Sequence, residues 1–207
     1  MKRYVMECLG TFFLTIAISL IGNPITIGLM LMAMIYVGGH ISGAHFNPAI
    51  TFACFIQNRI KLAEAGMYVA AQSLGAAFAL CFFTMITNNS FSLDMIPESP
   101  LIGSIAIEAL MVLVLCWVYL MMNVSNRYKD TAIAGIVLGL TLMAIVSAGS
   151  LFNPAVAIAS IACNVVKDGT FGGMASVLVY IVGPLLGGLA ASFIFDYFKS
   201  SEIQSIR

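Results

Sequence analysis

The sequence predicts an all-α membrane protein with six transmembrane helices and two shorter re-entrant half-helices, arranged as an inverted repeat. Three observations lead to this fold class: an apolar composition, six apolar segments of membrane-spanning length, and a short motif that occurs twice. Of the 207 residues, 61% are hydrophobic and 9% are charged, whereas soluble domains carry roughly 25% charged residues. A soluble core cannot hide so much apolar surface, so the solvent of this chain is lipid.

The six apolar segments are each near the roughly 20 residues that a helix needs to cross the hydrocarbon core. They cover residues 4–22, 25–42, 62–87, 101–123, 132–148 and 174–198. The start, Met1-Lys2-Arg3 before an apolar run, imitates a secretory signal. However, Glu7 interrupts the run early and no small-residue cleavage site follows. We therefore expect this segment to be retained as the first membrane helix.

Two further apolar stretches, 47–57 and 153–165, are too short to cross a membrane. A helix of about ten residues rises about 15 Å, which is half of a hydrocarbon core of about 30 Å. Each stretch begins Asn-Pro-Ala, and Asn is a favourable helix N-cap while Pro fits the first helical turn. We therefore expect two half-helices that begin at the middle of the membrane. Non-helical backbone is tolerated there only where it is buried or lines a wet cavity.

The basic residues predict six crossings with both termini in the cytoplasm. With Met1 inside, only Lys167 lies outside, and the outer segment 88–100 carries Asp94 and Glu98 without a basic residue. This asymmetry follows the positive-inside rule. The other eight basic residues all lie on the inner side: Lys2, Arg3, Arg59, Lys61, Arg127, Lys129, Lys199 and Arg207.

The two halves of the chain repeat each other. Residues 46–49 (Phe-Asn-Pro-Ala) recur at 152–155, and Glu7 in the first half corresponds to Glu108 in the second. Three crossings in each half, an odd number, place the halves in opposite orientations. We expect one transmembrane channel domain over 1–207, with repeats at about 1–88 and 101–200 and the site near the membrane midplane.

The expected site lies where the two half-helices meet. A helix N-terminus presents unpaired N–H groups and about half a positive charge, and Asn47 and Asn153 add amide donors. A neutral solute with an oxygen atom accepts these hydrogen bonds, whereas a cation is repelled. The residues thus favour a passive channel for small uncharged solutes. A coupled secondary transporter, which also uses inverted repeats, and a non-conducting protein of the same fold stay open as alternatives.

The residues around both motifs resemble those of the aquaporin, or major intrinsic protein, family. Residues 40–51 (HISGAHFNPAIT) and 149–155 (GSLFNPA) are similar to the two signatures of that family, and residues 7–13 (ECLGTFF) to its first-helix motif. The similarity covers essentially the whole chain. It implies the aquaporin fold, a homotetramer with one pore per subunit, and conduction of water or small neutral solutes without a cofactor. The pore motifs would be Asn47, Pro48, Ala49, Asn153, Pro154 and Ala155.

The resemblance places a selectivity filter at Ile27, Thr141, Ser150 and Val156, where the chain departs from the usual pattern. Most members have arginine at the position of Val156, and the glycerol-conducting branch has aspartate at that of Ala157. The aromatic residue and histidine of water-selective members are absent at Ile27 and Thr141. Valine lacks the bulk, charge and donors of arginine. We expect a wide, apolar filter that passes water with glycerol, urea, or the hydroxides of boron or arsenic; a strict water channel is the alternative.

The remaining polar residues are expected to support the site. A charge inside an apolar helix is costly, and the resemblance implies that Glu7 and Glu108 accept hydrogen bonds from the loops before the half-helices. The alternative role for them is proton coupling. For His45 the resemblance implies packing beside the first half-helix, and a pH-sensing role of His40 or His45 stays open. We expect no metal site, because a third ligand is lacking near the two histidines.

The cysteines and the chain ends lead to three further expectations. The five cysteines are scattered without a Cys-x-x-Cys spacing, and we assign them no disulfide, metal or redox role: Cys8, Cys54, Cys81, Cys116 and Cys163. No nucleophile–base set or phosphate loop is present, so the chain is not expected to be an enzyme, and its zero net charge gives no basic surface for nucleic acid. The short ends suggest a bacterial inner membrane.

Overall fold

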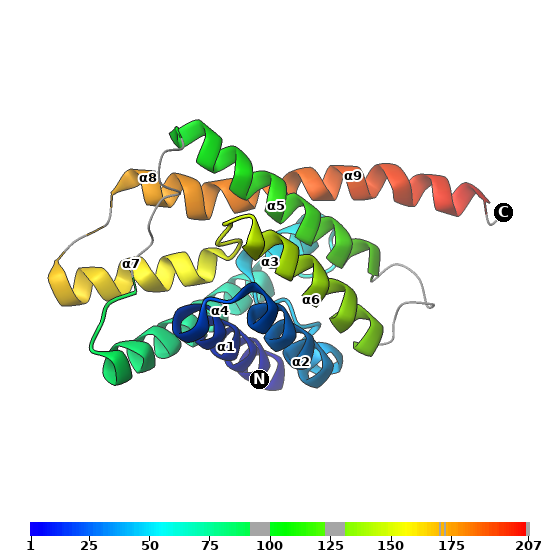
Figure 1. The fold of residues 1–207 in the computed structure, drawn as a ribbon. Helices are drawn as coiled ribbons and strands as arrows, with labels where there is room; N and C mark the ends of the chain where they lie inside the picture. Colours follow the sequence, from blue (N-terminus) through cyan, green and yellow to red (C-terminus); the bar gives the residue numbers. More distant parts are fainter. Residues whose placement is uncertain (92–99, 123–130, 170, 172, 206–207) are drawn as a thin grey trace.

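The computed structural model describes residues 1–91, 100–122, 131–169, 171 and 173–205. These residues form helices and connecting loops, with no strand among them (Figure 1). Five helical segments are long and apolar enough to cross a membrane: Lys2–Ile21, Pro24–Ser42 (α2), Leu62–Thr87 (α4), Leu101–Met122 (α5) and Met174–Lys199. The sixth, α6 (Thr131–Ser147), has 17 residues and rises about 25 Å. The all-helical membrane fold predicted from the sequence is confirmed.

Two of the crossing helices contain a π-helical turn. The first crossing consists of α1 (Lys2–Ile16) followed by a π-helical turn at Ala17–Ile21. The last begins as α8 (Met174–Val177), widens at Leu178–Val182, and continues as α9 (Gly183–Ser205). It therefore runs further than the predicted end at residue 198.

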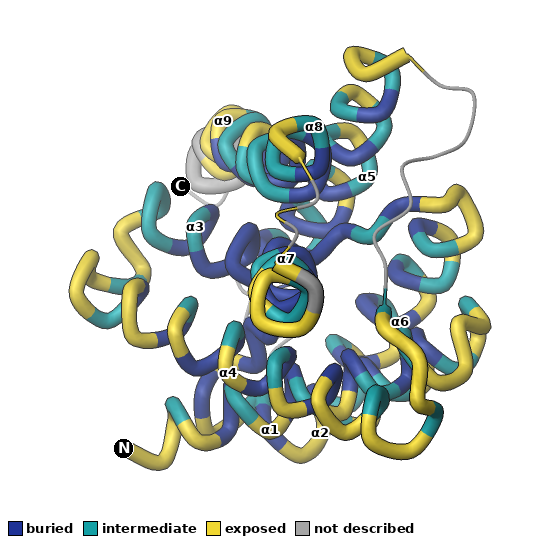
Figure 2. The backbone as a smooth tube through the Cα atoms, turned by 90° about the vertical axis from the view of Figure 1, so that its left-hand side faces the viewer, coloured by how far each residue is buried: buried dark blue, intermediate teal, exposed yellow. Residues whose placement is uncertain are grey.

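The two half-helices differ in length. Helix α3 covers Pro48–Ile56 with 9 residues, and α7 covers Pro154–Asp168 with 15 residues. These lengths correspond to rises of about 13 Å and 22 Å, so α7 is longer than the predicted half-crossing. It ends at Gly169, whose left-handed backbone (φ 66°) closes the helix. Figure 2 shows α7 end-on near the centre of the molecule, with the other helices around it.

The helices pack in pairs around this centre. Helix α1 packs against α4, α2 against α6, and α5 against α9, while α3 contacts α4, α5 and α9 and α7 contacts α4. Close approach between α2 and α6 depends on Gly28 and Gly139, because a Cβ atom on either residue would meet the backbone oxygen of the other. Small residues at such crossings let helix backbones touch within a membrane.

The outer surface of the helix assembly is apolar, as lipid requires. Large exposed hydrophobic side chains occur on every crossing helix, and they include Val5, Leu29, Phe78, Leu110, Leu140 and Phe193. The yellow stretches in Figure 2 mark such exposed faces on the outside of the molecule. Most polar residues that the sequence singles out are instead buried among the helices: Glu7, His45, Asn47, Glu108, Ser150 and Asn153.

Three of the described basic residues, Arg3, Arg59 and Lys199, lie at one end of the crossing helices. Arg3 forms an ion pair with Glu64, which joins the beginnings of α1 and α4. Arg59 and Lys199 both lie over the Phe195 ring, with 4.8 Å from the Arg59 Cζ and 5.6 Å from the Lys199 Nζ to the ring centroid. Lys167, at the far end of α7, donates instead to Ser90 beyond the end of α4. Six charged residues lie outside the described residues: Asp94, Glu98, Arg127, Lys129, Asp130 and Arg207.

Candidate pore where two half-helices meet

Two asparagines bind the beginnings of the half-helices to each other. The Nδ2 atom of Asn47 donates to the main-chain oxygen of Phe152 at 2.8 Å, and the Nδ2 atom of Asn153 donates to that of Phe46 at 2.9 Å. Each Oδ1 atom also caps its own helix, accepting from the backbone N–H of Ala49 at 2.8 Å and of Ala155 at 3.0 Å. An amide nitrogen carries two hydrogens, so each asparagine keeps one N–H that these bonds do not use.

The proline and alanine of each motif lie in the first turn of a half-helix. Proline at the first helical position needs no N–H partner, and Pro48 and Pro154 both line an apolar cavity of about 380 Å³ between α3, α4, α7 and the last crossing. Ala49 and Ala155 are fully buried. A Cβ atom at Gly188 of α9 would lie 2.9 Å from the Ala49 oxygen. The beginning of α3 therefore lies too close to α9 for a residue larger than glycine at position 188.

The loops before the half-helices share an unusual backbone. Phe46 and Phe152 have φ angles of 49° and 54°, in a left-handed region that non-glycine residues seldom adopt. Both aromatic rings are buried. This conformation costs of order 1–2 kcal/mol per residue, so the surrounding hydrogen bonds must hold it.

Glu7 supplies those bonds for the first loop. Its carboxylate accepts from the backbone N–H groups of His45 at 3.0 Å and Phe46 at 2.7 Å. It also accepts from the Ser42 hydroxyl at 2.6 Å and the Gln72 amide at 2.8 Å. Glu7 is fully buried, and hydrogen bonds to a buried carboxylate are about twice as strong as neutral ones.

Glu108 does the same for the second loop. It accepts from the backbone N–H groups of Leu151 at 2.6 Å and Phe152 at 3.0 Å, and from the Ser150 hydroxyl at 2.9 Å. Among the described residues no glutamine takes the place that Gln72 has beside Glu7. The two carboxylates thus accept four and three hydrogen bonds beside equivalent loops.

His45 belongs to a hydrogen-bonded chain at the inner side of the first loop. The Thr51 hydroxyl donates to the Asn47 carbonyl at 3.2 Å and accepts from Gln72 at 3.0 Å. The hydroxyl also lies 3.0 Å from the Nδ1 atom of His45. With the hydroxyl hydrogen directed at Asn47, the Nδ1–H of the neutral ring donates to Thr51 and the Nε2 atom is a hydrogen-bond acceptor.

The surroundings of His45 are polar on one side. Its ring is packed by Tyr68 and Tyr119, with centroids at 5.0 Å and 5.5 Å. It lines a cavity of about 210 Å³ together with Arg3, Arg59 and Glu64, at the end of the molecule where the basic residues gather. His40, by contrast, lies exposed in the last turn of α2.

The four expected filter residues carry no charge. Ile27 on α2 and Val156 on α7 are buried apolar side chains. The Thr141 hydroxyl on α6 donates to the Val137 carbonyl at 2.8 Å, and the Ser150 hydroxyl is the one that donates to Glu108. Both hydroxyl protons are therefore used within the protein, and neither hydroxyl is left as a donor to a solute.

Three residues of this site escaped the sequence analysis: Gln72, Thr51 and Ser42. Gln72 links Glu7 to Thr51, and a glutamine in the middle of an apolar helix is the signal that would have pointed to it. Ser42 donates to Glu7 and accepts from the Ala44 N–H at 3.1 Å. Serine and threonine are common in membrane helices, so their sequence signal is weak.

These features define a class of protein: a membrane channel whose centre is made by two half-helices meeting through paired asparagines. The sequence profile described as "MIP: Major intrinsic protein" matches residues 15–195. The Glycerol uptake facilitator protein-like 6 of Lactiplantibacillus plantarum is 32% identical over 213 residues, which cover 93% of this chain and 96% of the relative. Aquaporin NIP1-1 of Zea mays is 30% identical over 221 residues, which cover 96% of this chain and 75% of the relative.

The fold has a close counterpart among solved structures. The X-ray structure of the aquaglyceroporin from Plasmodium falciparum matches with a TM-score of 0.81 and 20% sequence identity, over 94% of this chain and 95% of that chain. The chain belongs to the major intrinsic protein family. It is an integral membrane protein and a passive channel for water and small uncharged solutes. The family is one of channels rather than enzymes.

Proposed function

We propose that this channel passes glycerol, urea and similar neutral solutes, such as the hydroxides of boron or arsenic, together with water. The proposed filter consists of Ile27, Thr141, Ser150 and Val156. The proposed pore centre consists of the two Asn-Pro-Ala motifs, at residues 47–49 and 153–155.

One observation carries this proposal: the filter lacks a charged residue and a free side-chain donor. Val156 follows the second motif directly and is apolar, and the Thr141 and Ser150 hydroxyl protons are bonded within the protein. A filter rich in hydrogen-bond donors binds water well, but it raises the free energy of a larger solute whose carbon skeleton cannot accept those bonds. In an apolar filter this free-energy cost is smaller, because the carbon skeleton contacts apolar side chains instead of water.

Two relatives support the choice of solute. One is named as a glycerol uptake facilitator-like protein of Lactiplantibacillus plantarum, and the structural neighbour is an aquaglyceroporin. The aquaporin of Zea mays supports water as a companion solute.

Ions are expected to be excluded at the pore centre. The two half-helices begin there, each with the positive end of its dipole, and the carboxylates of Glu7 and Glu108 are occupied by three or four donors each. A cation therefore meets positive potential without a free carboxylate. The same occupancy argues against a proton-coupling role of these two glutamates, which a coupled transporter would need.

Assembly and orientation follow as further parts of the proposal. We propose a single channel domain over residues 1–207, with inverted repeats at about 1–88 and 101–200, that forms a homotetramer. A native mass of four times the 22.1 kDa of one chain would support the tetramer. The clustered basic residues favour cytoplasmic termini, and the Lactiplantibacillus relative favours a bacterial plasma membrane.

The deciding experiment tests whether Val156 belongs to the filter, by measuring solute entry into vesicles for substitutions at this position. Proteoliposomes with wild type, Val156→Arg or Val156→Met face osmotic gradients of sucrose, glycerol, urea and boric acid, and stopped-flow light scattering records the volume. Methionine approaches arginine in length but brings neither charge nor strong donors. It therefore separates obstruction from the electrostatic effect.

We expect fast glycerol and urea entry in wild type, reduced at least tenfold by Val156→Arg and less by Val156→Met, with water flux retained in all three proteins. Fast water flux without solute entry in wild type would establish a strict water channel. Equal solute entry in wild type and Val156→Arg would show that Val156 does not belong to the filter.

A further inference from the structure

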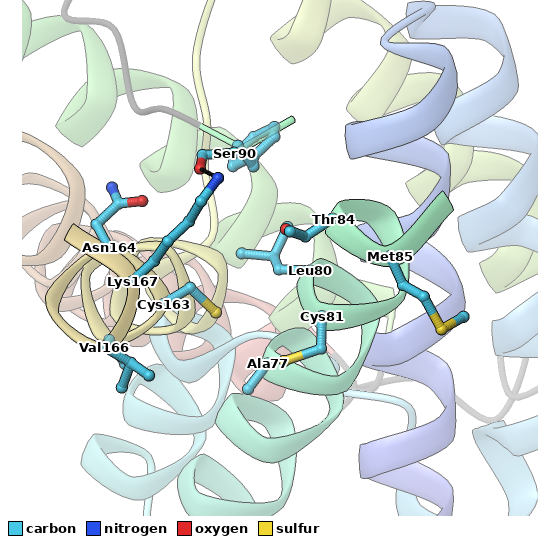
Figure 3. A pocket seen from close by; sticks show the side chains of 12 residues that line it. Ala77, Leu80, Cys81, Thr84, Met85, Ser90, Cys163, Asn164, Val166 and Lys167 are labelled. Atoms are coloured by element: carbon cyan, nitrogen blue, oxygen red, sulfur yellow. Dashed lines mark hydrogen bonds between the residues drawn. The ribbon is translucent and has the colours of Figure 1, made fainter. Parts of the chain in front are cut away.

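Cys81 and Cys163 lie in one cavity between the ends of α4 and α7 (Figure 3). The cavity has a volume of about 620 Å³ and a mostly apolar lining, with Lys167, Ser90 and Asn164 at its polar side. In Figure 3 the side chains of Cys81 and Cys163 both point into this cavity, from α4 and from α7. Two cysteines 82 positions apart in the sequence are thus brought together by the fold.

The helix faces explain why the two cysteines line the same cavity. Cys81 lies one turn after Ala77 on α4, and Cys163 lies one turn after Ala159 on α7, since residues four apart share a helix face. These alanines belong to the contact between α4 and α7, which Ala76, Ala77, Leu80, Ala155, Ala159 and Cys163 build. Small side chains let two helices approach closely, and a disulfide needs Cα atoms within about 7 Å.

Both cysteines of the pair are at least partly accessible. Cys81 is exposed, and Cys163 is half-buried, as Cys8 is. Cys54 and Cys116 are buried, with 2% and 0% of their surface exposed, while Cys8 lies on α1, with its backbone oxygen against Gly75 of α4. Reactive cysteines need partial exposure, so an oxidant reaches Cys81 and Cys163 before the buried thiols.

We propose that Cys81 and Cys163 form a redox-active dithiol, which closes to a disulfide between α4 and α7. With a small external disulfide as the oxidant, one cysteine thiolate attacks that disulfide and releases one external thiol. The second cysteine then attacks the mixed disulfide and releases the other external thiol. The two cysteines lose two electrons and two protons in total, and the external disulfide is reduced to two thiols.

A disulfide between Cys81 and Cys163 would also affect the proposed pore, because Cys163 lies on the half-helix α7. Helix α7 begins with Asn153 and Val156 at the proposed pore and ends near Cys163 and Lys167. A disulfide at its far end would tie the half-helix to α4. In the proposed orientation the pair lies on the outer side, where disulfides persist. From the sequence alone we expected no redox role for these cysteines, because 82 positions separate them and only the fold brings them to one cavity.

The test is chemical and does not depend on which solute the channel passes. Purified wild-type protein is treated with oxidised glutathione or with the small diazene oxidant diamide, which takes up the two electrons and two protons at its N=N bond. Free thiols are then counted with a maleimide, and digestion and mass spectrometry identify linked peptides. The matched controls are Cys81→Ser, Cys163→Ser, and a triple variant (Cys8→Ala, Cys54→Ala, Cys116→Ala) that keeps the pair.

We expect wild type and the triple variant to lose two free thiols within one chain, to yield a peptide that joins Cys81 to Cys163, and to recover both thiols with a reductant. Neither single serine variant should yield this link. Mixed glutathione adducts on both cysteines without a link, or links between chains alone, would overturn the proposal. Because the readout is a mass and not a flux, a failed solute assay leaves this result unaffected.

Discussion

Asn47 donates a hydrogen bond of 2.8 Å from its side-chain amide to the main-chain oxygen of Phe152. Asn153 returns an equivalent bond to Phe46, so each half-helix is positioned by the loop that precedes the other. The geometry of the pore centre is therefore a joint property of both halves, and a change in one asparagine acts on both loops.

Replacement of Asn153 by aspartate should admit cations. The carboxylate still accepts from the Ala155 N–H, but it cannot donate to Phe46, and it places a negative charge where two positive helix ends meet. We expect at least a tenfold rise in proton or potassium flux into proteoliposomes, recorded with an internal pH dye under a potassium diffusion potential.

The control for this change is Asn164→Asp, which adds the same charge about 16 Å further along α7. It should leave the ion flux at the wild-type level. Equal ion flux in Asn153→Asp and wild type would mean that the helix ends do not set the ion barrier.

Replacement of Glu108 by glutamine should destabilise the protein. In the wild type, Leu151, Phe152 and Ser150 donate to the two oxygens of the Glu108 carboxylate. A glutamine amide replaces one oxygen by an NH2 group, which cannot accept, so at least one of these three bonds is lost. A buried donor without a partner costs about 1–3 kcal/mol. The thermal midpoint in detergent should fall clearly. Glu64→Gln removes an ion pair at the protein surface, which contributes about 0–1 kcal/mol, and should change the midpoint little.

The glycines of α1 and α4 offer a second matched pair. A Cβ atom at Gly10 would clash with the Phe46 ring, whereas one at Gly66 would meet nothing within 4 Å. Gly10→Ala should therefore destabilise by about 1–3 kcal/mol, as overpacking does. Gly66→Ala should stabilise by up to about 1 kcal/mol through helix propensity. Thermal melts of both variants test this, and a Gly10→Ala protein as stable as wild type would contradict the packing described here.

The proposed orientation predicts opposite labelling of two engineered thiols. Asn89, beyond the end of α4, and Lys61, before its beginning, are both exposed. In a background with Cys81→Ser and Cys163→Ser, a membrane-impermeant maleimide should label Asn89→Cys in intact cells and Lys61→Cys only after lysis. The reverse pattern would place the termini outside.

The sequence predicted the helices well because each crossing carries its own signal. The bounds of α4 were predicted at residues 62–87 and are found there, since Lys61 and Asn88 flank an apolar run. For α7 the prediction ended at residue 165, where the apolar stretch ends, and it did not include Lys167 and Asp168. They form the last helical turn before Gly169, since the helix extends past the apolar stretch.

Contacts between distant residues were harder to predict. Spacing assigned Ser150 to the filter, but it could not reveal that the hydroxyl turns to Glu108. Gln72 and Thr51 acquire their roles only when α4 packs beside Glu7. Side-chain direction depends on the assembled helices, and a periodic pattern in one segment carries no information about it.

The exchanged asparagine bonds also bear on how the chain is made. When the first three helical segments have entered the bilayer, the Phe46 carbonyl still lacks the partner that Asn153 supplies, and Asn47 still lacks the carbonyl of Phe152. An unpaired polar group costs several kcal/mol in hydrocarbon, so the first loop cannot settle in a dry environment at that stage. During synthesis the first half of the chain therefore cannot form the pore centre alone. The pore centre is completed only after the second half has been synthesised and inserted.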